Sequence, residues 1–252
     1  MSAPTRAVLR GRPHAFRLSA GPSGLTAGHF PRYAVAVNVS LFTIQNGSLR
    51  VLLVKRAAPP FRGMWALPGG FVRRDESVDE AALRELQDAT GIATVYLEQL
   101  YTFGDPERDP RGRVVAVTYY ALVGWSQFQL KAARRMTSAA WCELERLPAL
   151  AFDHRKIVTA ALERLRNKVN YTSVAFQLLP KKFTLSELQQ AYEVIVGQTL
   201  DKRNFRKKML QLGILNNTGE RTTEGRQRPA RLYSFTEARV IKLQEKGINV
   251  PF

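Results

Sequence analysis

Residues 69–92, GGFVRRDESVDEAALRELQDATGI, constrain the fold more tightly than any other part of the sequence. Ser77 is followed three residues later by Glu80, the capping-box arrangement with which many helices begin. Gly91 is suited to end this helix, because glycine readily adopts the left-handed conformation that often follows a helix. Positions 85, 88 and 89 lie at i, i+3 and i+4 and project from one helix face. The segment therefore predicts a glycine-rich loop and a helix, one face of which carries Glu85, Asp88 and Ala89.

Segments of high β propensity flank this helix on both sides. The runs YAVAVNVSLFTI and LRVLLVKR are separated by QNGS, in which Asn46 and Gly47 favour a tight hairpin turn. A third run, GRVVAVTYYALVGW, follows the helix. Strands around a connecting helix predict an α/β domain, which we place at residues 31–150.

A second domain is predicted at residues 173–240, beginning with a helix. Thr184 and Glu187 form another capping box, and Gly197 is suited to end the helix. After a short turn, LDKRNFRKKMLQLGIL predicts a second helix with apolar side chains on one face and cations on the other. A helix, a turn and a basic helix form the helix-turn-helix pattern, whose second helix enters the DNA major groove.

The segment after the basic helix, LNNTGERTTEGRQRPARLYSF, predicts two short strands around an arginine-bearing loop, the wing of a winged helix. From residue 149 onward, 19 Lys and Arg face 9 Asp and Glu, so this part supplies 19 − 9 = +10 of the formal net charge of +17. Such an excess attracts polyanions, and double-stranded DNA is the predicted partner. The predicted DNA-binding residues are Lys202, Arg203, Arg206, Lys207, Arg226, Arg228 and Arg231. A small dimerisation module with a solvated charged face is the alternative.

The spacing within residues 69–92 resembles the Nudix box, G-x5-E-x7-R-E-U-x-E-E-x-G-U, in which U is aliphatic. The matching residues are Gly70, Glu76, Arg84, Glu85, Leu86, Gly91 and Ile92. Asp88 and Ala89 depart from the pattern. The resemblance implies the Nudix αβα sandwich with a mixed sheet, and a pairing of Glu76 with Arg84 that fixes the loop before the helix.

Three carboxylates on that helix face can bind Mg²⁺, which bridges a diphosphate and activates it towards attack by water. Here Asp88 is one methylene shorter than glutamate and Ala89 supplies no ligand, so Glu85 and Asp88 are expected to bind Mg²⁺ weakly if at all. We therefore expect no efficient hydrolysis and no required cofactor. The alternative is an ordinary hydrolase that takes a replacement acid from Glu98, Asp105 or Glu107.

The predicted effector site lies in KRAAPPFRGMWALPGGFV and in the polar loop FGDPERDPRGR, which is placed to close over it. Cations there supply charge for phosphates, aromatic rings supply stacking contacts, and glycines let the backbone approach a ligand closely. The predicted effector-binding residues are Lys55, Arg56, Trp65, Gly69, Gly70, Arg84, Phe103 and Arg111. The alternative is that the aromatic residues belong to the core and the cations are merely solvated.

A weakened Nudix box followed by a winged helix resembles the Nudix-related transcriptional regulators of NAD metabolism, the NrtR family. The resemblance implies a repressor of NAD synthesis or salvage genes that binds palindromic DNA as a homodimer. ADP-ribose, or a related nucleotide diphosphate, would release it from the DNA. Two alternatives stay open: an active Mg-dependent ADP-ribose pyrophosphatase, and a repressor of the same architecture that responds to a sugar.

Composition assigns the remaining segments. Residues 1–30 are predicted to be a flexible basic tail, residues 151–172 a linker helix and residues 241–252 a C-terminal tail. The single cysteine, Cys142, cannot form an internal disulfide, and no apolar run approaches the roughly 20 residues of a membrane span. We therefore expect a cytoplasmic protein that does not associate with a membrane. The resemblance to the NrtR family implies a bacterial protein that associates with the nucleoid through its operator.

Overall fold

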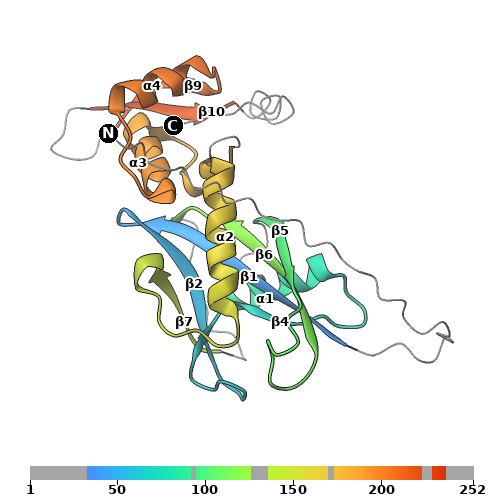
Figure 1. Cartoon of the computed structure of the whole chain (residues 1–252). Coiled ribbons are helices and arrows are strands. Elements are labelled where there is room, and N and C mark those ends of the chain that lie inside the picture. The colour runs from blue at the N-terminus through green and yellow to red at the C-terminus, as the bar shows by residue number, and fades with distance from the viewer. Residues whose placement is uncertain (1–32, 92–94, 126–135, 170–172, 223–228, 237–252) are drawn as a thin grey trace, which may run out of the picture. The chain divides into compact units, whose positions relative to one another are not determined.

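The computed structural model of the protein describes residues 33–91, 95–125, 136–169, 173–222 and 229–236. The predicted tails, residues 1–30 and 241–252, lie outside the described residues. A mixed β-sheet with a helix on each face forms the first domain, and helices with a three-stranded sheet form the second (Figure 1).

Seven strands form the larger sheet, in the order β3-β2-β1-β6-β5, with β4 paired to β1 and β7 paired to β2. The strands are β1 (Ala34–Gln45), β2 (Ser48–Arg56), β3 (Trp65–Ala66), β4 (Gly69–Phe71), β5 (Tyr96–Phe103), β6 (Val114–Leu122) and β7 (Met136–Glu143). β1 and β6 run parallel in register from Ala34 opposite Val114, whereas the other pairs are antiparallel. The sheet is therefore mixed, as predicted.

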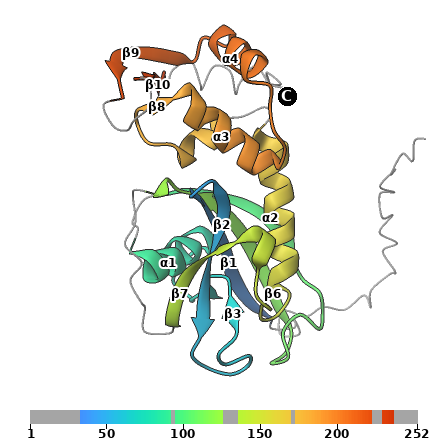
Figure 2. The same ribbon diagram turned by 90° about the vertical axis from the view of Figure 1, so that its left-hand side faces the viewer.

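Two helices, α1 (Val78–Thr90) and α2 (His154–Val169), cover opposite faces of this sheet (Figure 2). Because side chains alternate along a strand, β6 supplies both layers of the core. Tyr119 and Ala121 pack in the cluster that contains α1, whereas Tyr120 and Leu122 pack in the cluster that contains α2. This arrangement confirms the predicted αβα sandwich.

The residues predicted to form the hairpin turn and the ends of α1 adopt the expected conformations. Asn46 and Gly47 have φ values of 51° and 74° and join β1 to β2, which is the geometry of a tight hairpin. Ser77 Oγ accepts a hydrogen bond from the Glu80 amide at 3.2 Å, and Glu80 Oε2 accepts one from the Ser77 amide at 2.7 Å. Gly91 ends α1 with φ 76°.

The segment predicted as a linker helix forms α2 and is part of the first domain's core. Ile157, Ala161 and Leu165 are fully buried on the sheet side of this helix. A short 3-10 helix, η2 (Leu144–Arg146), precedes it. Helix α2 thus forms a layer of the sandwich as well as leading into the second domain.

The second domain has the elements of a winged helix. They are η3 (Ser173–Leu178), β8 (Phe183–Thr184), α3 (Leu185–Val196), α4 (Lys202–Gln211), β9 (Leu215–Arg221) and β10 (Arg231–Phe235), with sheet order β8-β10-β9. Thr184 and Glu187 form the predicted capping box of α3, and Asp201 caps α4 by accepting from the Asn204 amide at 2.8 Å.

Aromatic packing holds the elements of the winged helix together. Phe183 of β8 stacks on Phe235 of β10, with ring centroids 4.4 Å apart. Tyr192 of α3 meets Phe205 of α4 edge to face at 5.4 Å, and Met209 is fully buried beside them. These contacts fix α4 against α3 and leave its cationic side outward, as predicted.

The sequence did not indicate β5 and β7, nor the short strands β3, β4 and β8, the second of which lies where a glycine-rich loop was predicted. β5 lies at the edge of the sheet and carries Glu98 and Gln99, so its hydrophobic pattern is weak. Within the described ranges, no helix is both long and apolar enough to cross a membrane.

Candidate functional site

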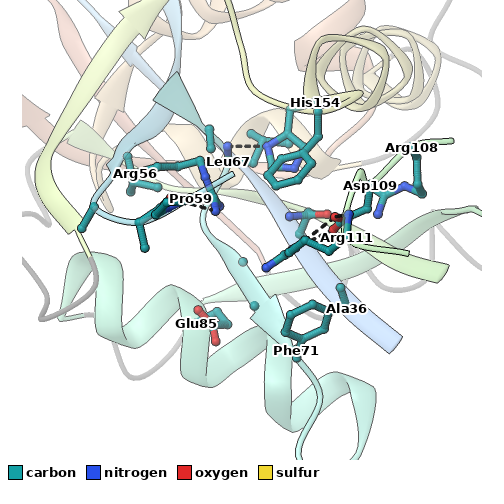
Figure 3. Close-up of a pocket in the computed structure, with 18 of the residues that line it drawn as sticks. Ala36, Arg56, Pro59, Leu67, Phe71, Glu85, Arg108, Asp109, Arg111 and His154 are labelled. Carbon is teal, nitrogen blue, oxygen red and sulfur yellow. Dashed lines mark hydrogen bonds and ion pairs between the residues drawn. The ribbon is translucent and has the colours of Figure 1, made fainter. Parts of the chain in front are cut away.

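A cavity of about 430 Å³ opens on the first domain beside the glycine-rich loop (Figure 3). Its lining comes from β1, the end of β2, the β3–β4 region, the loop that follows β5 and the start of α2. The polar and aromatic lining residues are Asn38, Lys55, Arg56, Phe71, Glu85, Arg108, Asp109, Arg111, Phe152 and His154. The cavity therefore combines four cations with two carboxylates and two aromatic rings.

The arginines of the cavity differ in how their charge is balanced. Arg111 binds Asp109 through two hydrogen bonds of 2.7 and 3.0 Å, and these bonds lower the pKa of Asp109 below its usual range. Arg56 donates from Nε to the carbonyl oxygen of Pro60 at 2.8 Å. Burial lowers the pKa of Arg56, and the positive charge of Arg111 lowers it further. An anion bound between Arg56 and Arg111 would relieve this repulsion.

Aromatic rings form the walls of the cavity around these guanidinium groups. The guanidinium carbon of Arg111 lies 4.9 Å from the Phe71 ring centroid and 5.7 Å from that of Phe152. The guanidinium of Arg56 lies 4.8 Å from the same Phe152 ring, and Phe61 meets this ring edge to face at 4.8 Å. Guanidinium groups and rings in alternation make a flat surface suited to a planar ring.

Two of these aromatic residues have a backbone conformation that is rare for side-chain-bearing residues. Phe61 has φ 62° and Phe152 has φ 54°. A non-glycine residue in this region costs on the order of 1–3 kcal/mol and persists only where surrounding contacts impose it. Phe152 lines the cavity and Phe61 packs against its ring, so the strain lies at and beside the cavity wall, where ligand-binding sites often hold it.

His154, the first residue of α2, is fixed as a neutral side chain at the cavity. Its Nδ1 accepts a hydrogen bond from the Leu67 amide at 2.9 Å. Burial lowers the pKa of His154 to about 3, and the nearby positive charges of Arg108 and Arg56 act in the same direction. With Nδ1 as the acceptor, the proton of the neutral ring resides on Nε2, so His154 provides a donor and no charge.

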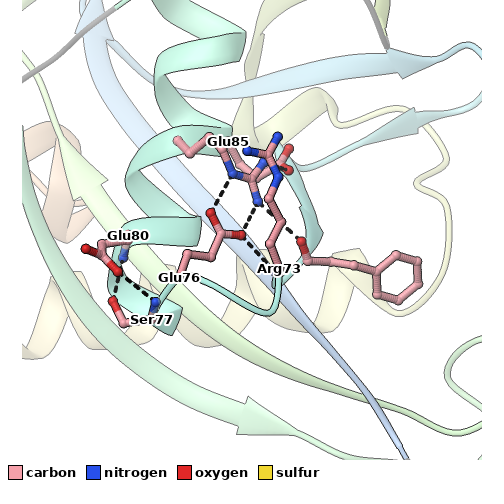
Figure 4. Close-up of polar contacts among 7 residues, drawn as sticks. Arg73, Glu76, Ser77, Glu80 and Glu85 are labelled. Carbon is pink, nitrogen blue, oxygen red and sulfur yellow. Dashed lines mark hydrogen bonds and ion pairs between the residues drawn. The ribbon is translucent and has the colours of Figure 1, made fainter.

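The Nudix-like box forms the predicted ion-pair network beside the cavity (Figure 4). Arg84 binds Glu76 through hydrogen bonds of 2.6 and 2.8 Å, and its Nη1 donates to Glu85 Oε1 at 2.5 Å. Glu76 also accepts from the Arg73 amide at 2.8 Å. Hydrogen bonds from Arg84 lower the pKa of Glu76 to about 2. The network fixes the loop before α1, as predicted.

The carboxylates of the box do not form a magnesium cage. Glu85 is buried and bound to Arg84, whereas Asp88 is exposed. Ala89 is fully buried among the apolar residues beneath α1. In the described parts of the chain, no group of three or more His, Cys, Asp or Glu side chains is placed to hold a metal ion. The donor set therefore does not fit the Mg²⁺ of the Nudix family.

The three candidate replacement acids also lie away from the cavity lining. Glu98 accepts from Lys168 at 2.5 Å and from Tyr120 at 2.8 Å. Asp105 accepts from the Glu107 amide at 3.1 Å. The alternative of a hydrolase with a replacement acid therefore gains no support from this lining.

Five of the predicted effector-binding residues line the cavity: Lys55, Arg56, Gly69, Gly70 and Arg111. Three do not. Trp65 lies opposite Lys55 in the sheet, Phe103 packs edge to face with Tyr101, and Arg84 is bound by the carboxylates of the box.

Other residues of the cavity carried weaker signals. Arg108 and Asp109 belong to the loop predicted to close over the site, but the residues of that loop predicted to bind the effector were Phe103 and Arg111. Phe152 and His154 lie at the start of the predicted linker helix, where neither composition nor periodicity indicated a binding role. Their assignment required knowing that α2 packs against the sheet.

The outward face of α4 forms a second candidate site. Lys202, Arg203 and Lys207 are exposed there, whereas Arg206 is half-buried and donates to Ser186 Oγ at 3.1 Å. Arg231 is exposed on β10. The wing residues Arg226 and Arg228 lie outside the described residues. The described cations suit a phosphate backbone and the edges of bases in a groove.

Family models match both domains of the chain. Residues 34–161 match the NUDIX domain, and residues 175–235 match the NrtR DNA-binding winged helix domain. The first match includes the first half of α2, consistent with the burial of this helix against the sheet.

Relatives are found for the whole chain and for the first domain alone. The chain is 38% identical to the ADPR responsive transcriptional repressor NtrR of Acinetobacter baylyi, over 88% of this chain and 87% of that protein. A crystal structure of Shewanella oneidensis NrtR complexed with a 27mer DNA is 39% identical with a TM-score of 0.73, covering 82% of this chain and 95% of that one. An ADP-ribose pyrophosphatase of Methanocaldococcus jannaschii is 41% identical over 43% of this chain and 63% of that protein.

Proposed function

The chain belongs to the NrtR family of Nudix-domain transcriptional regulators, and from this premise we propose that it is a repressor whose hold on operator DNA is released by ADP-ribose. The observation that carries the proposal is one chain with both a cationic, aromatic cavity and a basic winged helix. In this proposal, the cavity binds ADP-ribose and α4 is the recognition helix that binds operator DNA.

ADP-ribose matches the cavity in charge and in shape. Its diphosphate is an anion for Arg56 and Arg111, whose positive charges repel one another. Its adenine is a planar ring for the aromatic and guanidinium surfaces of Phe71 and Phe152. His154 Nε2 and the Asn38 amide are neutral donors for ribose hydroxyls.

The departures from the Nudix box support binding of ADP-ribose without its efficient hydrolysis. Ala89 provides no ligand and Glu85 is held by Arg84, so the site lacks the cage that would concentrate Mg²⁺ at the diphosphate. We propose that the protein needs no cofactor and is not an efficient hydrolase. A sensor that leaves its ligand intact reports the ligand's concentration directly.

Operator binding is assigned to α4 in the major groove, with β9, β10 and the wing beside it. Two copies on a palindrome would place two such helices in successive grooves, which makes a homodimer the proposed functional form. Genes of NAD synthesis or salvage are the proposed targets. If ADP-ribose binds better to the DNA-free form, then ADP-ribose and operator must weaken each other's binding by the same factor.

Genome-wide binding-site selection with and without ADP-ribose tests the proposal. We expect a small set of palindromic sites upstream of genes for NAD synthesis or salvage, with occupancy lost on adding ADP-ribose. Calorimetric titration with ADP-ribose, NAD and simple sugars identifies the effector. Binding of a sugar in place of ADP-ribose would keep the repressor but replace its effector.

An ADP-ribose pyrophosphatase is the second candidate function, favoured by the intact network of Glu76, Arg84 and Glu85. Release of AMP from ADP-ribose in the presence of Mg²⁺, at ordinary enzyme rates and abolished by Glu85→Gln, would support it. We expect no such turnover.

A further inference from the structure

Three consecutive residues at the start of α2, Phe152 to His154, connect this helix to the walls of the cavity. Phe152 is itself a wall, Asp153 binds the loop after β5, and His154 accepts from the β3–β4 region. We propose that these three residues, together with Arg108, transmit occupancy of the cavity to α2. The proposal rests on the function proposed above and names the residues that would couple its two sites.

The Arg108–Asp153 pair is the firmest of these connections. Arg108 Nη2 donates to Asp153 Oδ1 at 2.7 Å, and Arg108 Nε donates to Asp153 Oδ2 at 3.0 Å, so the ion pair is bidentate. The two side chains are 3% and 9% exposed. Arg108 lines the cavity, whereas Asp153 does not. The pair therefore connects a ligand-facing loop to the beginning of a helix.

Phe152 makes cation–π contacts, which an anionic ligand in the cavity would weaken. Its ring is flanked by the guanidinium groups of Arg56 at 4.8 Å and Arg111 at 5.7 Å. A diphosphate attracts both cations, and this attraction competes with their contacts to the ring. Phe152 is also held in a left-handed conformation that its neighbours must impose. Loss of its cation partners would let residues 151–153 relax.

The remainder of α2 permits such a movement without breaking the fold. Its inward side is apolar, with Ile157, Ala161 and Leu165 against the sheet, and such contacts tolerate small sliding shifts. Directional bonds occur again near its far end, where Lys168 lies 2.5 Å from Glu98 and Arg164 donates to the Leu100 carbonyl at 3.3 Å. A displaced first turn would therefore tilt the helix about its far end. Because α2 leads through residues 170–172 into η3, the tilt acts on the DNA-binding domain.

Asp153→Asn tests the relay, because it removes the carboxylate while preserving size, and Asp153 is not itself a residue of the cavity lining. In the wild-type protein, we expect ADP-ribose to weaken affinity for a selected operator by about 5–150-fold, the usual range for coupled sites. In Asp153→Asn, we expect ADP-ribose binding and operator binding each to persist while this factor falls towards 1. Operator affinity is measured by fluorescence anisotropy and ADP-ribose affinity by calorimetry.

Glu163→Gln is the matched control, because Glu163 is exposed on the same helix and the change also removes one negative charge. It should keep the wild-type factor. A wild-type protein whose operator binding is unaffected by ADP-ribose would contradict the proposed function itself. A wild-type response that Asp153→Asn retains in full would overturn only the relay.

Hydrogen exchange on the wild-type protein provides a test that does not depend on the variant's folding. ADP-ribose should change the protection of amides in the first turns of α2 as well as in the cavity loop. Operator release with unchanged protection along α2 would overturn the relay.

Discussion

Gly70 and Glu85 are in such close contact that a Cβ atom at position 70 would lie 2.2 Å from Glu85 Oε1. The glycine thus leaves the space into which the buried carboxylate points. Arg84 completes the arrangement by donating to the same oxygen. The glycine-rich loop and the first acid of the box are therefore one structural unit, although Asp88 and Ala89 depart from the rest of the box.

Gly70→Ala should destabilise the first domain by about 1–3 kcal/mol, because an added methyl forces the buried Glu85 side chain to shift. The measurement is the free energy of unfolding in urea. Gly104→Ala is the matched control, since a Cβ at Gly104 meets nothing within 4 Å. Equal stability of the two variants would contradict the close contact.

Ala89→Glu, which restores the motif, should not restore hydrolysis. Position 89 is fully buried in the apolar cluster beneath α1, so the new carboxylate would be desolvated without a partner. We expect a loss of several kcal/mol in the free energy of unfolding. We also expect no gain in Mg-dependent release of AMP from ADP-ribose. A clear gain in turnover would mean that α1 rotates to open the metal face.

Local chemistry explains which parts of the fold were predictable. Ser77 with Glu80, Thr184 with Glu187, and Asn46 with Gly47 each act over a few residues, so the sequence alone indicated the helix starts and the hairpin. The edge strand β5 was missed because its solvent-facing positions carry polar residues. Tertiary pairing, rather than propensity, makes it a strand.

The candidate site was predictable where its residues lie in the two segments that the sequence singled out. Lys55, Arg56 and Gly70 belong to the segment KRAAPPFRGMWALPGGFV and Arg111 to the polar loop FGDPERDPRGR, and the fold brings both segments to the cavity. His154 lies 87 positions from Leu67, the residue whose amide it accepts from. No local pattern encodes such a contact, since it depends on the packing of α2.

The stability of the protein should fall as the pH drops below about 6.5 because of His154. The pKa of His154 is lowered to about 3 in the folded state. Between about pH 3 and pH 6.5, His154 is therefore protonated in the unfolded state but neutral in the folded state. The contribution is fully present above 6.5 and is lost as pH falls towards 3. From pH 7.5 to 5.5, this one group should remove about 1.4 kcal/mol.

His154→Gln checks this prediction, because glutamine retains an acceptor for the Leu67 amide but does not titrate. Its free energy of unfolding should vary less between pH 7.5 and 5.5 than that of the wild type. The other histidines of the sequence are His14 and His29, and a variant with both changed to glutamine is the control. If that control flattens the dependence and His154→Gln does not, the assignment to His154 is wrong.

Arg203→Ala combined with Lys207→Ala should weaken operator binding and make it less sensitive to salt. Both side chains are exposed on the outward face of α4, one helical turn apart. If each neutralises one phosphate, their loss reduces the slope of log K against log salt by about 1.8. Arg206→Ala should also disturb the placement of α4 against α3, because Arg206 donates a hydrogen bond to Ser186 Oγ of α3. The measurement is operator affinity at several salt concentrations, with ADP-ribose affinity unchanged.

Arg146→Ala combined with Lys156→Ala removes the same charge from the first domain and should leave the slope of log K against log salt as in the wild type. An equal reduction in both pairs would show that net charge, rather than contact through α4, governs binding.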